Sequence, residues 1–478
     1  MNLMDLVYPE GMQMNPAEIA AACGLTGYSC DGIGIGGILK SRFEDFRVEE
    51  VGRVPALEPR GRFTVARVTL TNWETNRFVG KLAKILGISR NRIWFSGTKD
   101  KRAITTQLLV IDAPQNKVSE VELSDVDIEV LGRSHQKLGF GDHSANRFTI
   151  TVRGCADADG SPLEAKDAIA RVNHIFENME LRLGPGKFPN WIGPQRFGAT
   201  RPVTPVVGRA VISDNWEEAV DTYLGMPGIQ QQDDVVAFRS HWRETRNVDE
   251  CLDMIPRHLG FERDMLQHLQ RKPEDWLGAF RKLPNNLQLM MVHSLQSEAF
   301  NRIIAARLDA GLTLTDPIPG DIVGMVQDNG KIDMAKLVEV DPEIQSRIQR
   351  NCRRGRLAVT ASLPGAESVF SDSTPGRIEH DVVSKMGLMD QDWKVSGIPR
   401  LSSKGSRRAM TVGFSEFSVE EASDIESSYL STRYAQGPLE GEVWNPDGCS
   451  LRIRFSLPSG TYATVLMREF MRAPLTQY

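Results

Sequence analysis

The chain has 478 residues, of which 41% are hydrophobic and 25% are charged, so it is long enough for two or three globular domains. Its 62 Asp and Glu outnumber its 57 Lys and Arg, which counts against a uniformly basic nucleic-acid-binding surface. Basic segments at residues 76–92, 347–356 and 400–408 leave a locally basic surface open, and no apolar run approaches the ~20 residues of a membrane span.

The cysteines and histidines lack the common metal and redox motifs. Six cysteines lie far apart without a CxxC pair, and eight histidines form no HExxH, so we expect no metal site. Few cysteines in a long chain favour a reducing compartment. Residues 1–16 are acidic and interrupted by prolines, unlike a secretory signal, and we expect a cytoplasmic protein.

Residues 32–37 carry glycines with the G-x-G-x-x-G spacing of a nucleotide-binding loop. Such a loop needs a strand before it and a helix after it. Here the following segment alternates Phe46 and Val48 with Arg47 and Glu49, which is a strand pattern. We therefore reject a dinucleotide site and expect a flexible lead-in to a strand.

A helix is predicted over residues 71–87. Thr71 and Glu74 have the spacing of a capping box at its start, and Gly87 ends it. Apolar residues recur at helical spacing between these limits. The expected buried face consists of Phe78, Leu82, Ile85 and Leu86.

The next segment is predicted to be two strands joined by a strongly charged turn. Apolar runs at residues 92–97 and 105–111 flank the turn, which carries Lys99, Asp100, Lys101 and Arg102 in a row. A solvated turn would explain these charges. A carboxylate held in its charged form by neighbouring cations would explain them as well.

Strands and helices continue to alternate up to about residue 188. Phe148, Ile150 and Val152 share one face of a predicted strand, and a helix is predicted over residues 165–184. This mixture is typical of an α+β sheet domain.

A segment rich in Gly and Pro at residues 184–198 reads as a domain boundary. The chain then becomes helical, with a long helix ended by Gly311, before a small β region at residues 317–326. Near residue 400 the strand pattern returns and is followed by a final helix that contains Tyr462. We infer a domain inserted into a sheet domain, divided as 1–188, 189–398 and 399–478. The alternating face of the last strand consists of Leu451, Ile453, Phe455 and Leu457.

Six segments, taken in order, resemble the TruD family of tRNA pseudouridine synthases. They are ILKSRFEDFRVEE, SGTKDKRAITTQ, SANRFTI, FPNWIGPQRFG, LQSEAFNRIIAARL and LPSGTYATVLMRE. The resemblance implies a pseudouridine-synthase α+β fold with a mixed, mostly antiparallel sheet and an inserted α/β TRUD domain. That domain would face the sheet across a basic cleft that grips tRNA, with Gln195, Arg196 and Phe197 as a structural hinge. We expect a monomer.

The resemblance also implies an isomerase that converts a uridine of tRNA, position 13 in the D arm, to pseudouridine. The reaction breaks the C1′–N1 bond, turns the uracil and rejoins it through C5, so it needs neither cofactor nor metal. It does need an ionised carboxylate as nucleophile or base. Asp100 falls at the family's catalytic aspartate, and Lys99, Lys101 or Arg468 is the expected cationic partner.

The remaining candidates each keep a simpler structural interpretation. Phe148 matches the family's active-site phenylalanine and would stack on the flipped base, or it is a core residue. Asn146 would bond the Asp100 loop or the uracil edge, or it is a turn residue. Lys40 would contact phosphate and Tyr462 would line the pocket, or they are a solvated lysine and a helix-packing residue. Arg468, if it does not bind, is an ordinary surface helix residue.

Two alternative functions compete with a tRNA pseudouridine synthase. A non-catalytic tRNA-binding or RNA-chaperone protein on the same fold is disfavoured by the intact Asp100 and its flanking cations. An RNA methyltransferase would need a glycine loop after a strand, and residues 32–37 do not qualify.

Overall fold

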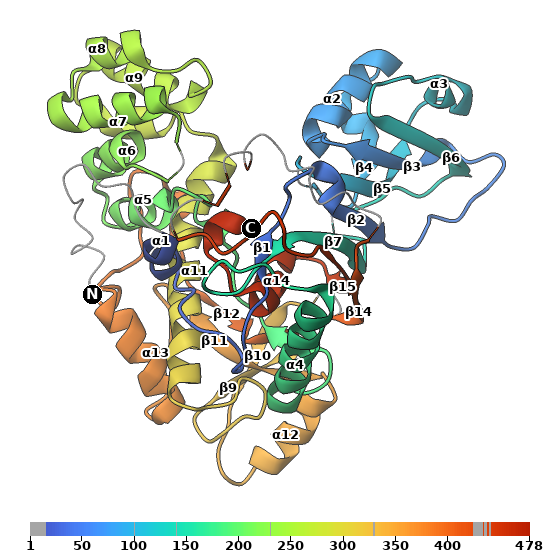
Figure 1. The fold of residues 1–478 in the computed structure, drawn as a ribbon. Helices are drawn as coiled ribbons and strands as arrows, with labels where there is room; N and C mark the ends of the chain where they lie inside the picture. Colours follow the sequence, from blue (N-terminus) through green and yellow to red (C-terminus); the bar gives the residue numbers. More distant parts are fainter. Residues whose placement is uncertain are drawn as a thin grey trace.

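The computed structural model describes residues 16–99, 101–139, 141–229, 231–327, 330–423, 434, 437–438 and 441–478. Within these residues the largest element is a nine-stranded sheet in the order β14-β15-β7-β2-β5-β3-β6, with β1 paired to β7 and β4 to β5 (Figure 1). Its strands are β1 Gly36–Ile38, β2 Phe46–Val51, β3 Phe63–Thr71, β4 Ile93–Phe95, β5 Ile104–Ile111, β6 Val126–Ser134, β7 Ala145–Cys155, β14 Ser415–Glu421 and β15 Leu451–Pro458.

The sheet is mixed and mostly antiparallel, as predicted. Only β2 and β5 pair in parallel among the strand pairs of the described residues. Strand β15, from the end of the chain, lies between β14 and β7, so the C-terminal segment completes the sheet of the N-terminal segment. The fold belongs to the α+β class, and the division into 1–188, 189–398 and 399–478 stays a prediction.

The predicted strand–turn–strand is an antiparallel β4–β5 pair, with Ile93 opposite Ile111. The glycines of residues 32–37 lead into β1. The described residues 39–51 then form a three-residue 3₁₀ helix, Phe43–Asp45, and strand β2, but not the α-helix that a dinucleotide site would need. No helix in the described ranges combines the length and apolar character that crossing a bilayer requires. The helices of this part are α1 Pro16–Ala22, α2 Thr75–Leu86, α3 Gln115–Ser119, α4 Ala165–Leu183 and α14 Ala463–Met471.

The predicted start of helix α2 is wrong. The N-cap is Glu74, whose carboxylate accepts hydrogen bonds from the backbone N–H groups of Asn76 and Arg77. Thr71 instead ends strand β3, where it pairs with Ile104. Gly87 ends the helix in a left-handed conformation, as expected. Ile85 is exposed, so its assignment to the buried face is also wrong.

The two halves of the sheet have separate hydrophobic cores. Helix α2 packs against β3 and β5, where Leu109 and Ile111 are buried. Phe148, Ile150 and Val152 of β7 pack instead with residues of α4 and α14, including Ile175. The predicted alternation along β7 is confirmed, and the same is true of the four apolar residues listed for β15.

A short antiparallel pair, β8 Lys187–Pro189 with β13 Thr411–Gly413, marks where the chain leaves this sheet and returns to it. Between these strands the chain first forms a helical bundle and then a four-stranded sheet in the order β10-β9-β11-β12 (Figure 1). The helices are α5 Val203–Ile212, α6 Trp216–Gly225, α7 Asp233–Thr245, α8 Val248–Met254, α9 Gly260–Arg271, α10 Trp276–Phe280, α11 Asn285–Asp309, α12 Gln345–Arg353 and α13 Thr374–Lys385, and the strands are β9 Ile322–Val326, β10 Ile332–Glu339, β11 Leu357–Leu363 and β12 Ser406–Ala409.

Helix α11 is the central element of this inserted part. It is the long helix predicted to end at Gly311, and most of its residues are buried, including polar ones such as Glu298 and Asn301. It contacts α5, α13 and β11. Strand β12 pairs with β11, so the second sheet takes its last strand from beyond residue 398.

Candidate active site

Strand register brings the predicted site residues to one face of the large sheet. Residues paired directly across neighbouring strands project their side chains to the same side. Asn146 on β7 pairs with Glu50 on β2. Two residues further along β7, Phe148 pairs with Val48 on β2 and with Phe455 on β15. This face is therefore polar where β2 ends and aromatic further along.

The polar end is built around the buried carboxylate of Glu50. Its side chain is 2% exposed, and it accepts a hydrogen bond from Lys99 Nζ at 3.0 Å. His143 lies between Glu50 and Asn146, with its Nδ1 4.0 Å from Glu50 Oε2 and its Nε2 3.4 Å from Asn146 Nδ2. We call Glu50, Lys99, His143 and Asn146 the Glu50 cluster.

Asp100, the predicted catalytic residue, lies outside the described residues. The chain on both sides of it is anchored. The backbone N–H of Lys99 donates to Thr75 Oγ1 at the start of α2, at 2.9 Å. The guanidinium of Arg102 donates to the carbonyl oxygen of Ser41 at 2.9 Å. These two bonds hold the described residues before and after Asp100, and the role of Asp100 stays a prediction.

The Lys99 ammonium has a carboxylate partner that the sequence analysis did not predict. It is bound to Glu50, and its side chain is only 8% exposed. Lys101, on the other side of Asp100, is exposed. A buried ammonium and carboxylate need each other, because either one alone would carry a large desolvation cost. Lys99 therefore contributes to a neutral pair rather than a free positive charge.

Phe148 lies in a row of aromatic rings. Its ring stacks on Phe455 with centroids 5.4 Å apart and meets the edge of Phe46 at 6.0 Å. Lys40 Nζ lies 4.3 Å from the centroid of the Phe46 ring. Phe148 is 7% exposed, so most of its side chain packs in the core, as the simpler structural interpretation expected. Its stacking on a base stays a prediction.

The two predicted residues of the last helix occupy different environments. Tyr462 is the N-cap of α14 and lies against Gly193, where an added Cβ would come within 3.1 Å of the tyrosine ring. Arg468 is buried, and its guanidinium donates to the carbonyl oxygens of Leu25 and Gly27. The expectation of an ordinary surface residue at Arg468 is therefore wrong. Its pairing with Asp100 stays a prediction.

Besides Glu50 and His143, two more polar residues of this face were missed by the sequence analysis. Thr105 pairs with Val48, and Gln107 lies two residues further along β5 on the same side. Within the described residues, Thr105 Oγ1 and both amide atoms of Gln107 are buried without a hydrogen-bond partner. The only signal was the polar run from Thr105 to Gln107 near the start of an otherwise apolar strand. Thr105 and Gln107 therefore extend the polar end of the face. Their unpaired atoms are unusual, because buried polar groups without a partner are rare in folded proteins.

The three basic segments differ in exposure. Arg347, Arg350, Arg353, Arg354 and Arg356 on and after α12 are exposed, as are most of the cations along α2. By contrast, Arg407 and Arg408 in the segment 400–408 are half-buried, whereas Arg400 and Lys404 of that segment are exposed. No three His, Cys, Asp or Glu side chains gather as a metal site in the ranges that the structure describes, and the expectation of a metal-free reaction stays a prediction.

The pKa of His143 lies below its ordinary value of 6.5, because the ring is largely buried and Lys99 is close, while Glu50 opposes the shift. Stability that depends on the neutral imidazole is therefore complete above pH 6.5 and is lost as the pH falls through the lowered pKa. Between about pH 7.5 and about pH 5.5, we expect the Tm of the unmodified protein to fall by more than the Tm of His143→Gln falls. Thermal melts at both pH values test this.

The matched control for that measurement is His135→Gln, because His135 is an exposed histidine of the same loop region. Its pH dependence should equal that of the unmodified chain. An unchanged pH dependence in His143→Gln would contradict the assignment of a neutral His143.

Comparison with known proteins places this chain in one family. The family model described as tRNA pseudouridine synthase D (TruD) matches residues 22–470. Two relatives named "Probable tRNA pseudouridine synthase D" are similar along nearly their whole length. One from Methanosarcina acetivorans is 35% identical over 460 residues, covering 96% of this chain and 98% of that protein. One from Halobacterium salinarum is 36% identical over 468 residues, covering 95% and 97%.

A solved structure agrees with the sequence comparison. The structure described as "Crystal Structure of the Putative tRNA pseudouridine synthase D (TruD) from Methanosarcina mazei" superposes with a TM-score of 0.79 at 33% sequence identity. The match covers 98% of this chain and 100% of that one, so it includes both the large sheet and the inserted part.

Proposed function

Because the chain belongs to the TruD family of tRNA pseudouridine synthases, we propose that it isomerises a uridine of tRNA, at position 13 in the D arm, to pseudouridine. The observation that carries this proposal is the family match across residues 22–470, together with the same fold in both parts of the chain. The segments that carry the resemblance also meet around the Glu50 cluster. Glu50 belongs to the first segment, Lys99 to the second and Asn146 to the third.

The reaction we propose conserves every atom of the nucleotide except for one exchanged proton. The C1′–N1 bond breaks, the uracil rotates, C5 bonds to C1′, and the proton on C5 leaves while N1 gains one. Asp100 would act as the ionised carboxylate, by attack at C1′ or at C6 or by removing a proton. No electron acceptor or phosphate donor enters this balance.

The buried groups of the Glu50 cluster would orient the base and exclude water. Asn146 is bonded to His143, and its Oδ1 is buried without a partner in the part of the chain that the structure describes, so it has capacity to accept a hydrogen bond from the uracil edge. Phe148 would contact the base through its remaining exposed rim. Lys40 is the candidate for a contact with phosphate, and Tyr462 is the candidate for the lining of the pocket. A cytosolic location and a monomeric state stay predictions.

A mapping experiment tests this function. The purified protein is incubated with an unmodified tRNA transcript in EDTA, and pseudouridine is located by carbodiimide labelling and primer-extension stops. We expect one new stop, at position 13, and none on a transcript in which that uridine is replaced by cytidine. Tight binding of tRNA without a stop would contradict the proposal and favour the RNA-binding alternative.

A further inference from the structure

Two cysteines lie opposite each other at one end of the strand pair β7–β15. Cys155 is the last residue of β7, and Cys449 comes shortly before β15 begins at Leu451. The backbone N–H of Cys155 donates to the carbonyl oxygen of Cys449 at 2.9 Å. Residues bonded in this way across antiparallel strands have Cα atoms about 5.5 Å apart. A disulfide joins residues whose Cα atoms are about 4.4–6.8 Å apart, so the backbone spacing suits one.

A shift in strand register produces this arrangement. Along β7 and β15 the pairing places Leu451 opposite Val152, and the same register would continue to Gly448 opposite Cys155. The hydrogen bond between the two cysteine backbones is one residue out of that register, and Gly154, with a φ of +62°, lies at the shift. A left-handed glycine of this kind is typical of a β-bulge. The bulge therefore brings a second cysteine opposite Cys155.

Three backbone hydrogen bonds hold the two cysteines in place. In addition to the bond from Cys155, the N–H of Cys449 donates to the carbonyl oxygen of Leu163 at 3.0 Å. The N–H of Leu163 donates in turn to the carbonyl oxygen of Cys155 at 3.0 Å, which closes a ring through three segments of the chain. Gly448 lies against this ring, because a Cβ atom there would come within 2.0 Å of the Cys155 carbonyl oxygen. The fold thus fixes the spacing of the two cysteines.

The two thiols differ in exposure and acidity. Cys155 is fully buried, whereas Cys449 is partly exposed. A hydrogen-bonding interaction between the two thiols raises the pKa of Cys155, and burial acts in the same direction. The same interaction lowers the pKa of Cys449, against the effects of burial and of the charges on Glu421 and Glu164. Because the thiolate is the nucleophilic form, Cys449 is the more reactive of the two.

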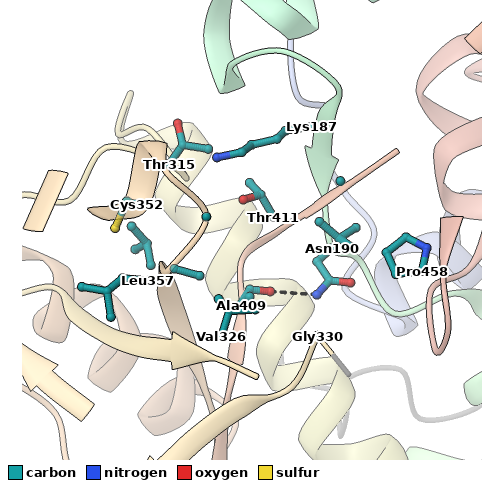
Figure 2. A pocket seen from close by; sticks show the side chains of 15 residues that line it. Lys187, Asn190, Thr315, Val326, Gly330, Cys352, Leu357, Ala409, Thr411 and Pro458 are labelled. Atoms are coloured by element: carbon teal, nitrogen blue, oxygen red, sulfur yellow. Dashed lines mark hydrogen bonds between the residues drawn. The ribbon is translucent and has the colours of Figure 1, made fainter. Parts of the chain in front are cut away.

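The other four cysteines of the chain are buried, and burial raises the pKa of each. They are Cys23, Cys30, Cys251 and Cys352. Cys352 shows the contrast with Cys449 most clearly. It lines a pocket of about 210 Å³ between β8, β13 and the sheet of the inserted part, and the described lining of that pocket holds no second cysteine (Figure 2). The partly exposed thiol of Cys449, by contrast, has a second thiol beside it, which is the arrangement of a redox-active pair.

We propose that Cys155 and Cys449 form a reversible disulfide when the protein meets a peroxide. The bond would join β7 to the segment before β15 and would close a loop that contains the whole inserted part. Cys155 ends β7 whereas Asn146 lies at its start, so the bond would stabilise the sheet without touching the Glu50 cluster. This proposal does not depend on the proposed function.

The oxidation proceeds in two balanced steps. The Cys449 thiolate attacks one oxygen of hydrogen peroxide, the O–O bond breaks, and the hydroxide that leaves is protonated to water. This step gives a sulfenic acid at Cys449. The Cys155 sulfur then attacks the Cys449 sulfur, the S–O bond breaks, and a second water leaves as the S–S bond forms. The two thiols lose two electrons and two protons in total, and these reduce the peroxide to two molecules of water.

The test treats the whole chain with hydrogen peroxide, blocks the remaining thiols with iodoacetamide and digests the protein without reductant. Mass spectrometry should find one cross-linked pair of peptides, which joins Cys155 to Cys449. Two of the six thiols should be lost, and dithiothreitol should restore them. The oxidised chain should melt at least about 5 °C above the reduced chain, because the bond closes a long loop and restricts the unfolded state.

Three variants keep the test decisive. Cys449→Ser should form no cross-link and should keep its Tm in peroxide. Cys155→Ala leaves the sulfenic acid of Cys449 without a thiol to react with, so dimedone should label Cys449 in this variant and not in the unmodified chain. If Cys155→Ala fails to fold, Cys449→Ser decides the test, since Cys449 is partly exposed. The matched control is Cys352→Ala, which removes a buried thiol and should keep both the cross-link and the rise in Tm.

The outcomes separate this proposal from the proposed function. A cross-link between Cys155 and Cys449, with no pseudouridine formed by the unmodified chain, would support the disulfide and contradict the enzyme activity. An active enzyme that keeps all six thiols in peroxide would overturn the disulfide. Oxidation of Cys449 to a sulfinic acid without a cross-link would overturn it too, as would a cross-link between the Cys449 residues of two chains.

Discussion

Replacing Asp100 with Asn is expected to lower the rate of pseudouridine formation by at least about a thousandfold while tRNA affinity stays within about twofold. Asn has the size of Asp but cannot act as a nucleophile or accept a proton at neutral pH. The flanking anchors, Lys99 to Thr75 and Arg102 to Ser41, do not involve the Asp100 side chain, so the loop should keep its shape. Single-turnover rates and filter binding on one tRNA transcript measure both quantities.

Asp127→Asn is the matched control for that comparison. Asp127 is an exposed carboxylate on β6, in the same half of the large sheet, opposite Thr69. Its removal changes the charge by the same amount and should leave the rate unchanged. A rate for Asp100→Asn within tenfold of the unmodified chain would assign the chemistry to another residue.

The largest loss of stability in the sheet domain is expected from Asp45→Asn. Asp45 and Arg153 are 1% and 3% exposed and form a bidentate pair at 2.7 and 2.8 Å. Asp45 also accepts from the backbone N–H of Arg42 at 2.8 Å, which fixes the turn before β2. Removing the carboxylate takes the Asp45 counter-charge away from the buried Arg153 guanidinium, which costs about 3–5 kcal/mol. Urea unfolding of the variant measures this cost.

An exposed pair on the same two strands provides the control. Glu49 on β2 and Arg147 on β7 lie 3.4 Å apart, and both are about half exposed. Glu49→Gln should therefore cost less than about 1 kcal/mol. In the double variant of Asp45→Asn with Arg153→Met, part of the loss should return, because no unpaired charge remains buried. Equal losses for Asp45→Asn and Glu49→Gln would contradict the assigned role of the buried pair.

Much of the fold was predictable because its periodic segments are long. The alternation at Phe148, Ile150 and Val152, and the same pattern in the last strand, follow from one face of the sheet being buried. The start of α2 was not predictable from local spacing. Thr71 fits a capping box, but pairing with Ile104 keeps it in β3, so Glu74 becomes the cap. Tertiary pairing here overrides a local signal.

The residues of the candidate site were predictable only through the family resemblance. The partners that their side chains bind in the fold were not predictable at all. Lys99 was expected beside Asp100 because it is adjacent in sequence, yet its ammonium reaches Glu50, which is 49 positions away. Arg468 was expected either beside Asp100 or at the surface, and its guanidinium is buried and donates to carbonyl groups near the other end of the chain, while its pairing with Asp100 stays a prediction. Such partners depend on strand register and helix packing, which a local pattern does not contain.

The central claim is that this protein moves the uracil of a tRNA uridine from N1 to C5. It is tested most directly with tRNA that carries tritium at C5 of its uridines, because C5 must lose its hydrogen when it bonds to C1′. With EDTA present, we predict release of tritium to water that ends near one equivalent per tRNA and is absent with Asp100→Asn. Tight binding of the labelled tRNA without any release of tritium would contradict the claim.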